Sequence, residues 1–204
     1  PMNRIPMTRP SLLVRLRDPT NQTAWEEFVD LYTPLVHGFC RLRGLQEADA
    51  ADVAQEVMQA VARSIGKFEY QPDKGTFRSW LFTVTRNKFN NFLEKSRRQP
   101  LGSGDTAVQR FIEAQPCSEP EAAWDRQYHQ RLFDWACQQV RREFQEATWQ
   151  AFLRTAVEDE SGNVVAQRLG LSVGAVYIAK SRVLARLREK VLEATGDTAL
   201  WVKG

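Results

Sequence analysis

The chain has 204 residues, of which 43% are hydrophobic and 26% are charged, and its formal net charge at pH 7 is +3. This composition can form one moderate hydrophobic core or two small ones. Charged residues interrupt the apolar stretches before they reach the roughly 20 residues of a membrane-spanning helix, so we expect no membrane insertion. Residues 1–16 lack the continuous apolar run of a secretory signal, which predicts a cytoplasmic protein.

The residues that usually carry catalysis or bind metals are few and widely separated. Three cysteines (Cys40, Cys117 and Cys137) and two histidines (His37 and His129) have no zinc-binding spacing. We find no paired nucleophile and base and no glycine-rich phosphate loop. The sequence therefore predicts no catalytic residues, no metal site and no cofactor, and we do not expect an enzyme.

Helical periodicity runs through most of the sequence and predicts an all-α protein. Residues 99–120 contain three prolines and two glycines without a sustained apolar period, which is typical of a flexible linker. We therefore expect two small helical domains, residues 11–98 and 121–194, joined by this linker, with terminal tails at 1–10 and 195–204. Residues 78–98 and 168–190 each hold six basic residues and one acidic residue, whereas 99–122 have a charge balance of −3. Such basic segments are often solvated helix faces, but two of them on separate domains favour binding to a polyanion at two places.

The first informative helix is predicted around residues 49–61. Its valines Val53, Val57 and Val61 recur every four residues and indicate a buried face. A polar stripe that includes Asp52, Glu56 and Gln59 lies on the opposite face. The simplest interpretation of this stripe is contact with solvent.

A polar loop with aromatic residues, 67–75, precedes a long predicted helix, 76–98. That helix has more aromatic residues than one packing face needs, and its polar stripe consists of Thr83, Arg86, Asn87, Asn90 and Arg97. Most of the aromatic residues are expected in the core. An unstacked base offers a π face and a hydrogen-bonding edge, so this mixture favours binding of single-stranded nucleic acid.

Residues 164–176 have the spacing of a helix-turn-helix. Ala166 is small enough for a close helix crossing, Gly170 can adopt the left-handed turn conformation, and Ser172 can cap the second helix. On the second helix, residues at helical spacing face inward: Val176, Ala179, Val183 and Leu187. This arrangement directs four others outward, where they could contact a DNA major groove: Tyr177, Ile178, Ser181 and Arg182. An ordinary helical hairpin with an exposed tyrosine and isoleucine is the alternative.

Residues 49–61 and 75–87 resemble the second conserved region of the sigma-70 family, most closely in its small extracytoplasmic-function (ECF) group. Residues 164–176 and 181–189 resemble that group's fourth region. The resemblance implies a sigma factor that binds core RNA polymerase and directs promoter recognition and transcription initiation. The partners implied are the β′ clamp and β flap of core RNA polymerase, promoter DNA and an anti-sigma factor.

The resemblance also implies three sets of site residues. The helix that docks on polymerase would use Asp49, Asp52, Gln55, Glu56 and Gln59. The minus-ten element would be bound by Lys67, Phe68, Tyr70, Lys74, Thr83, Arg86, Asn87, Asn90 and Arg97. The minus-thirty-five element would be bound as duplex by Ser172, Ala175, Tyr177, Ile178, Ser181 and Arg182.

Two departures from the family pattern limit these expectations. Housekeeping sigma factors have a tryptophan pair where this chain has Thr83 and Val84, so weaker promoter melting is expected. Many relatives have Lys or Arg at the positions of Tyr177 and Ala179, so their minus-thirty-five preference does not transfer. A stand-alone helix-turn-helix regulator is the alternative function, and it would bind duplex DNA without polymerase. A nucleic-acid enzyme is a more distant third.

Overall fold

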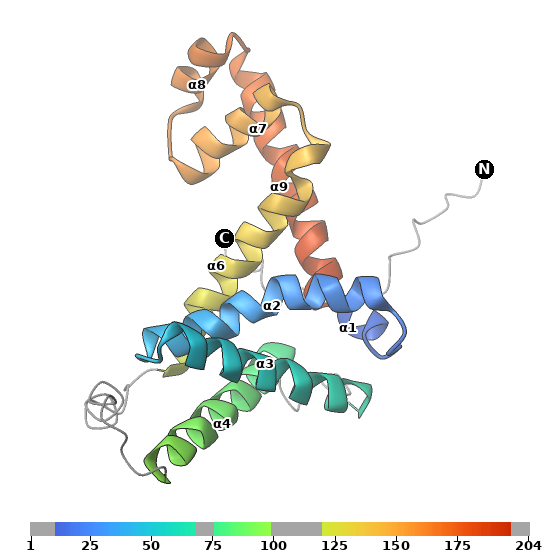
Figure 1. Ribbon diagram of the computed structural model, residues 1–204. Helices are drawn as coiled ribbons and strands as arrows, with labels where there is room; N and C mark the ends of the chain where they lie inside the picture. The colour runs from blue at the N-terminus through green and yellow to red at the C-terminus, as the bar shows by residue number, and fades with distance from the viewer. Residues whose placement is uncertain (1–10, 68–75, 99–119, 197–204) are drawn as a thin grey trace, which may run out of the picture. The chain divides into compact units, whose positions relative to one another are not determined.

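The computed structural model describes residues 11–67, 76–98 and 120–196 (Figure 1). Every regular element in these ranges is helical, which confirms the all-α prediction. The chain forms two compact units: Leu12–Arg131, and the residues from Leu132 onward together with Ser11. No helix in the described ranges has both the length and the apolar character needed to cross a lipid bilayer.

The first unit begins with four helices and a 3-10 turn. They are α1 (Leu12–Arg15), α2 (Gln22–Leu42), α3 (Glu47–Ser64), η1 (Ile65–Lys67) and α4 (Phe77–Arg98). Asn21 caps α2 by accepting a hydrogen bond from the Ala24 amide at 3.1 Å. Helix α3 packs against both α2 and α4 (Figure 1). The valines predicted to face inward on α3 are buried, as their spacing indicated.

Aromatic side chains from α2 and α4 form much of the first unit's core. The ring of Phe39 on α2 lies 5.9 Å from that of Phe82 and 6.0 Å from that of Phe89, both edge-to-face. Phe82, Phe89 and Phe77 are buried, whereas Trp80 and Phe92 are partly exposed. The unusual aromatic content of α4 therefore serves mainly packing.

Helix α6 (Pro120–Val140) is divided between the two units, because the boundary falls between Arg131 and Leu132. The sequence placed the start of the second domain at residue 121 instead. Trp124, only 1% exposed, packs its ring 5.4 Å from that of Phe39 and 5.5 Å from that of Phe82. These contacts make the first turns of α6 part of the first unit's core.

Polar contacts reinforce this docking of α6. Arg131 donates hydrogen bonds to the carbonyl oxygens of Leu31 at 3.3 Å and Asp30 at 2.7 Å. Nε of Arg78 on α4 lies 3.2 Å from a carboxylate oxygen of Asp125. Hydrogen bonds from a charged donor fix the helix in register as well as adding stability.

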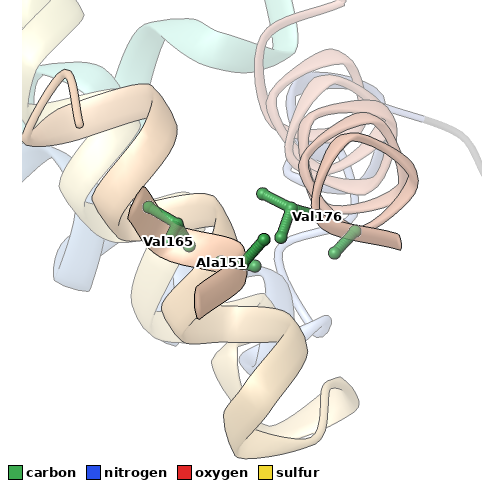
Figure 2. Packing of buried hydrophobic residues seen from close by; sticks show 5 residues of the cluster. Ala151, Val165 and Val176 are labelled. Atoms are coloured by element: carbon green, nitrogen blue, oxygen red, sulfur yellow. The ribbon is translucent and has the colours of Figure 1, made fainter. Parts of the chain in front are cut away.

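The second unit contains the remainder of α6 and the helices after it. They are η3 (Arg141–Glu143), α7 (Glu146–Phe152), the π-helical turn η4 (Leu153–Val157), α8 (Gly162–Leu169) and α9 (Val173–Thr195). Figure 2 shows Ala151 of α7, Val165 of α8 and Val176 of α9 directed toward one another in a small buried cluster. Gly196, in the left-handed conformation with φ of 68°, ends α9 one residue beyond the predicted end of the domain.

Candidate polymerase-binding and DNA-binding surfaces

The predicted polymerase-binding residues form one outward-facing stripe on α3. We call Asp49, Asp52, Gln55, Glu56 and Gln59 the α3 stripe. Asp52, Gln55 and Gln59 are exposed, and Asp49 and Glu56 are partly buried. The valines on the other face of α3 are buried, so helical geometry presents this stripe to solvent as the periodicity predicted.

Glu56 differs from the rest of the α3 stripe because it is tied to α4. Its carboxylate oxygens lie 3.3 Å from Nζ of Lys88 and 3.6 Å from Nζ of Lys95. Two lysines on the neighbouring helix thus neutralise this acid. Glu56 stabilises the packing of α3 on α4 in addition to any role in docking.

A hollow of about 620 Å³ lies between α2 and α3, beside the α3 stripe. Its lining is largely apolar and includes Val29, Pro34, Ala54 and Met58, together with Glu47 and with Gln55 of the α3 stripe. An apolar depression next to an exposed polar stripe is the kind of surface that binds a protein partner.

The polar residues of α4 form a second surface on the first unit. We call Thr83, Arg86, Asn87, Asn90 and Arg97 the α4 stripe. The first four are exposed. The Arg86 guanidinium carbon lies 5.8 Å from the centre of the Phe82 ring, and Thr83 donates a hydrogen bond to the Ser79 carbonyl at 3.0 Å. Asn87 and Asn90 keep their amides available to a ligand.

Several predicted minus-ten residues lie outside the described part of the chain. Phe68, Tyr70 and Lys74 fall between the described ranges. The backbone of Lys67 belongs to η1 and that of Arg97 to α4, but neither side chain is described. The structure therefore places the α4 half of this predicted surface and leaves the loop half untested.

The helix-turn-helix has the local geometry that its sequence indicated. Gly170 adopts the left-handed conformation with φ of 66°, and its amide donates to the Ala166 carbonyl. Oγ of Ser172 accepts a hydrogen bond from the Ala175 amide at 3.1 Å and so caps α9. The four α9 residues predicted to face inward are all buried. Ser172 and Ala175 therefore set the start of α9.

The outward residues of α9 form an open surface. We call Tyr177, Ile178, Ser181 and Arg182 the recognition face. Tyr177 and Ile178 are 54% and 62% exposed, and Ser181 and Arg182 are exposed as well. Arg182 has no ion-pair or hydrogen-bond partner within the described ranges. Large exposed apolar side chains beside an unpaired arginine are suited to a ligand with both methyl groups and hydrogen-bond acceptors, as the major groove has.

The basic segment 168–190 is less available to a polyanion than its sequence suggested. Oε1 of Glu160 lies 2.8 Å from Arg168 and 3.1 Å from Arg154, and Lys180 donates to the Thr155 carbonyl at 3.0 Å. Arg186 and Lys190 are paired with acids of the same unit. Four of the six basic residues thus have partners within the unit. Arg182 is the basic residue of the recognition face, and it has no partner among the described residues.

A family model described as sigma-70 region 2 matches residues 28–99, which extend from within α2 to the end of α4. The ECF RNA polymerase sigma factor RpoE of Cereibacter sphaeroides is 30% identical over 88 residues, covering 43% of this chain and 48% of that protein. The ECF RNA polymerase sigma factor SigE of Mycolicibacterium smegmatis is 26% identical over 183 residues, covering 89% of this chain and 67% of that protein.

Residues 28–99 thus match sigma-70 region 2, and the chain is similar to two ECF sigma factors. It spans about half the length of the first of these two relatives and two thirds of the second. The solved structure of CnrH in complex with the cytosolic domain of CnrY is 22% identical, covers 86% of this chain and 92% of that one, and has a TM-score of 0.35.

The docking of α6 on the first unit was not predicted from the sequence. Trp124, Tyr128, Leu132 and Trp135 recur at helical spacing and are all buried, so a continuous apolar face was visible in the sequence. Such periodicity indicates a buried face but not the unit to which it belongs. Trp124 and Tyr128 fall in the first unit, and Leu132 and Trp135 fall in the second. The hydroxyl oxygens of Tyr32 and Tyr128 lie 3.5 Å apart, and burial raises the pKa of Tyr32 well above its ordinary value.

The two described cysteines, Cys40 and Cys137, are shielded from solvent to different degrees. Cys40 is fully buried, and burial raises the pKa of its thiol to about 12. Cys137 is partly exposed, and burial together with the nearby Asp134 raises the pKa of its thiol to about 11. A thiol with a raised pKa is a poor nucleophile and a poor metal ligand.

Proposed function

We propose that this chain is a promoter-specificity subunit: it binds core RNA polymerase and directs transcription initiation at particular promoters. The observation that carries the proposal is the presence, in one chain, of the α3 and α4 stripes within the family-matching segment and of an open recognition face on α9. A regulator that only binds duplex DNA needs the recognition face but neither of the two stripes.

Polymerase docking is assigned to the α3 stripe and the adjoining hollow. Asp52 and Gln55 are exposed, and Gln55 and Glu47 line the largely apolar hollow. Acidic side chains beside an apolar depression fit a partner with basic and apolar side chains. The resemblance to ECF sigma factors favours the β′ clamp as that partner, with the β flap as a second contact for the C-terminal unit.

Promoter DNA is assigned to two surfaces with different chemistry. The exposed amides of Asn87 and Asn90 suit the edges of bases that have left the stack, because these edges are inaccessible within a duplex. The recognition face combines Arg182 with Tyr177 and Ile178, which suits the edges of paired bases in a major groove. We therefore assign the minus-ten element to the α4 stripe and the minus-thirty-five element to the recognition face.

The test is reconstitution with purified bacterial core RNA polymerase. Gel filtration should show the chain eluting with the core enzyme, and the complex should initiate from a subset of randomised promoter templates that core enzyme alone ignores. A chain that binds a specific duplex tightly without polymerase, and does not associate with polymerase, would instead be a stand-alone regulator. An anti-sigma partner remains a prediction, and it would be detected as a protein that prevents this association.

A further inference from the structure

The ring of Tyr177 on the recognition face lies against Gly162, the first residue of α8. A Cβ built on Gly162 would lie 2.9 Å from Cζ and 2.9 Å from Oη of Tyr177, and 3.1 Å from its Cε2. Real Cβ atoms essentially never lie within 3.0 Å of such atoms. Any side chain at position 162 therefore excludes the observed position of the Tyr177 ring.

The backbone of Gly162 does not itself require glycine. The described glycines with positive φ are Gly44, Gly170 and Gly196, so Gly162 has a conformation open to any residue. Glycine in a helix lowers its stability relative to alanine, because the unfolded glycine backbone has more conformational freedom. Gly162 is buried, although Ser161 and Asn163 on either side are exposed. Space for the tyrosine ring is thus the physical reason for glycine at this position.

This contact determines which part of Tyr177 faces outward. The hydroxyl end of the ring is directed back onto α8, whereas the residue as a whole remains 54% exposed. Tyr177 makes no hydrogen bond with any described residue. The neighbouring Ile178 is 62% exposed. The surface presented by these two residues is therefore largely apolar.

We propose that Gly162 is a positioning residue that holds Tyr177 so that the flank of its ring, rather than its hydroxyl, contacts a thymine methyl group in promoter DNA. The inference rests on the proposed function, in which the recognition face enters a major groove. Among the base edges of that groove, the C5-methyl of thymine is the apolar group, whereas the other groups are hydrogen-bond donors and acceptors. An apolar ring flank held in one position can distinguish thymine from bases that lack this methyl.

The positional part of the proposal can be tested without DNA or polymerase. The full chain has four tyrosines, so labelling with 3-fluorotyrosine gives a simple fluorine NMR spectrum in which Tyr177→Phe identifies the Tyr177 signal. Gly162→Ala should shift this signal and leave unchanged that of Tyr32, which is buried in the other unit, and the urea midpoint should not fall. An unshifted Tyr177 signal would overturn the positioning role.

The recognition part is tested with holoenzyme on a promoter selected by the parent protein from randomised templates. Each thymine of the minus-thirty-five element is replaced in turn by deoxyuridine, which differs only in lacking the methyl group. At one position we expect initiation to fall by about fivefold or more, the loss expected for one favourable base contact. Tyr177→Phe should retain this discrimination, whereas Tyr177→Ala and Gly162→Ala should lose it.

Ile178→Ala is the matched control, because it removes the adjacent exposed apolar side chain and should retain the discrimination at that position. The proposal is overturned if Tyr177→Ala discriminates as the parent does, or if Tyr177→Phe abolishes discrimination. A parent holoenzyme that initiates normally but treats deoxyuridine as thymine everywhere also overturns it and leaves the proposed function intact. A parent chain that never directs initiation refutes the proposed function itself, while the fluorine shift still reports on the Gly162 contact.

Discussion

Glu56 on α3 and Lys88 on α4 form an ion pair, with Nζ of Lys88 3.3 Å from Oε2 of Glu56. Lys95, which lies about two turns further along α4, has its Nζ 3.6 Å from the other oxygen of the same carboxylate. The pair belongs to the packing of the first unit, although Glu56 lies within the predicted polymerase-binding stripe. A mutational test of docking must therefore separate loss of a contact from loss of stability.

Asp52 provides that separation. It is exposed and has no ion-pair partner in the described ranges, so Asp52→Lys should change the free energy of unfolding by no more than about 0.5 kcal/mol. The same substitution should remove coelution with core RNA polymerase. Glu56→Lys should weaken coelution and also lower the free energy of unfolding by about 1 kcal/mol, because it places three positive charges together.

Glu121→Lys is the matched control for this test, since it makes the same charge change on α6, outside the α3 stripe. It should leave coelution unchanged. If Asp52→Lys still coelutes with polymerase as the parent does, the α3 stripe is not the docking surface.

Asn87 should be needed to hold melted DNA. Its amide is exposed on α4, and it can hydrogen-bond base edges only after the bases have left the stack. Asn87→Ala should therefore reduce transcription from a duplex promoter more than from one with a pre-melted bubble. Asn163→Ala, an exposed asparagine on α8, should leave this ratio unchanged. Equal losses on both templates for Asn87→Ala would argue against a role in melting.

Arg182 is expected to contact DNA because it is the arginine of the recognition face and has no ion-pair partner among the described residues. If it donates two hydrogen bonds to guanine, Arg182→Ala should cost about 1 to 3 kcal/mol and relax preference at one base position. If it contacts phosphate, the loss of affinity should be uniform across promoters. The slope of the logarithm of the binding constant against the logarithm of the salt concentration should then fall in magnitude by about one. The measurement is initiation by holoenzyme across promoter variants and salt concentrations.

Arg188→Ala is the matched control for Arg182. Arg188 is also exposed on α9 and has no described ion-pair partner, but it lies outside the recognition face. It should have less effect on initiation than Arg182→Ala. An Arg182→Ala protein that matches the parent on every promoter and at every salt concentration would remove Arg182 from the interface.

Trp124 should dominate the docking of α6 on the first unit. Trp124→Ala should lower the free energy of unfolding by about 3 to 5 kcal/mol, because it empties the space between Phe39 and Phe82. Trp124→Phe should cost much less, since it preserves an aromatic ring and removes Nε1, which is buried without a hydrogen-bond partner in the described structure. Urea unfolding of the full chain measures both values, and equal losses would contradict this packing.

The second unit should lose stability in acid through Glu143. Nε and Nη2 of Arg186 donate to its two carboxylate oxygens at 2.6 and 3.0 Å, and these hydrogen bonds lower the pKa of Glu143 below its ordinary value of 4.5. A lowered pKa in the folded state stabilises the protein above the unfolded-state pKa, and this contribution is lost as the pH falls through the folded-state pKa. The difference in urea midpoint between the parent and Glu143→Gln should thus be constant near neutral pH and shrink below about pH 4.5. A difference that grows in acid would contradict this assignment.

The sequence was sufficient to predict those features that depend on interactions between residues close together in the chain. The left-handed Gly170, the Ser172 cap and the inward residues of α9 follow from steric and hydrogen-bonding rules that act within a few residues. The same holds for the outward direction of the α3 stripe and for the start of α4 within one residue of its predicted position. Helical periodicity alone therefore determined the all-α class and which faces of these helices are exposed.

Only the tertiary structure decided which charged and aromatic residues already make packing contacts or ion pairs within the protein. Trp124 lies in the first unit, Glu56 is held by Lys88, and Tyr177 rests on Gly162; each contact joins residues between 15 and 85 positions apart in the chain. A periodic pattern shows that a residue faces a neighbour or solvent, but it carries no information about which distant element supplies that neighbour. The tertiary structure also decided that Arg168 and Arg186 form ion pairs whereas Arg182 stays available to a ligand. Ion pairs form wherever packing brings opposite charges together.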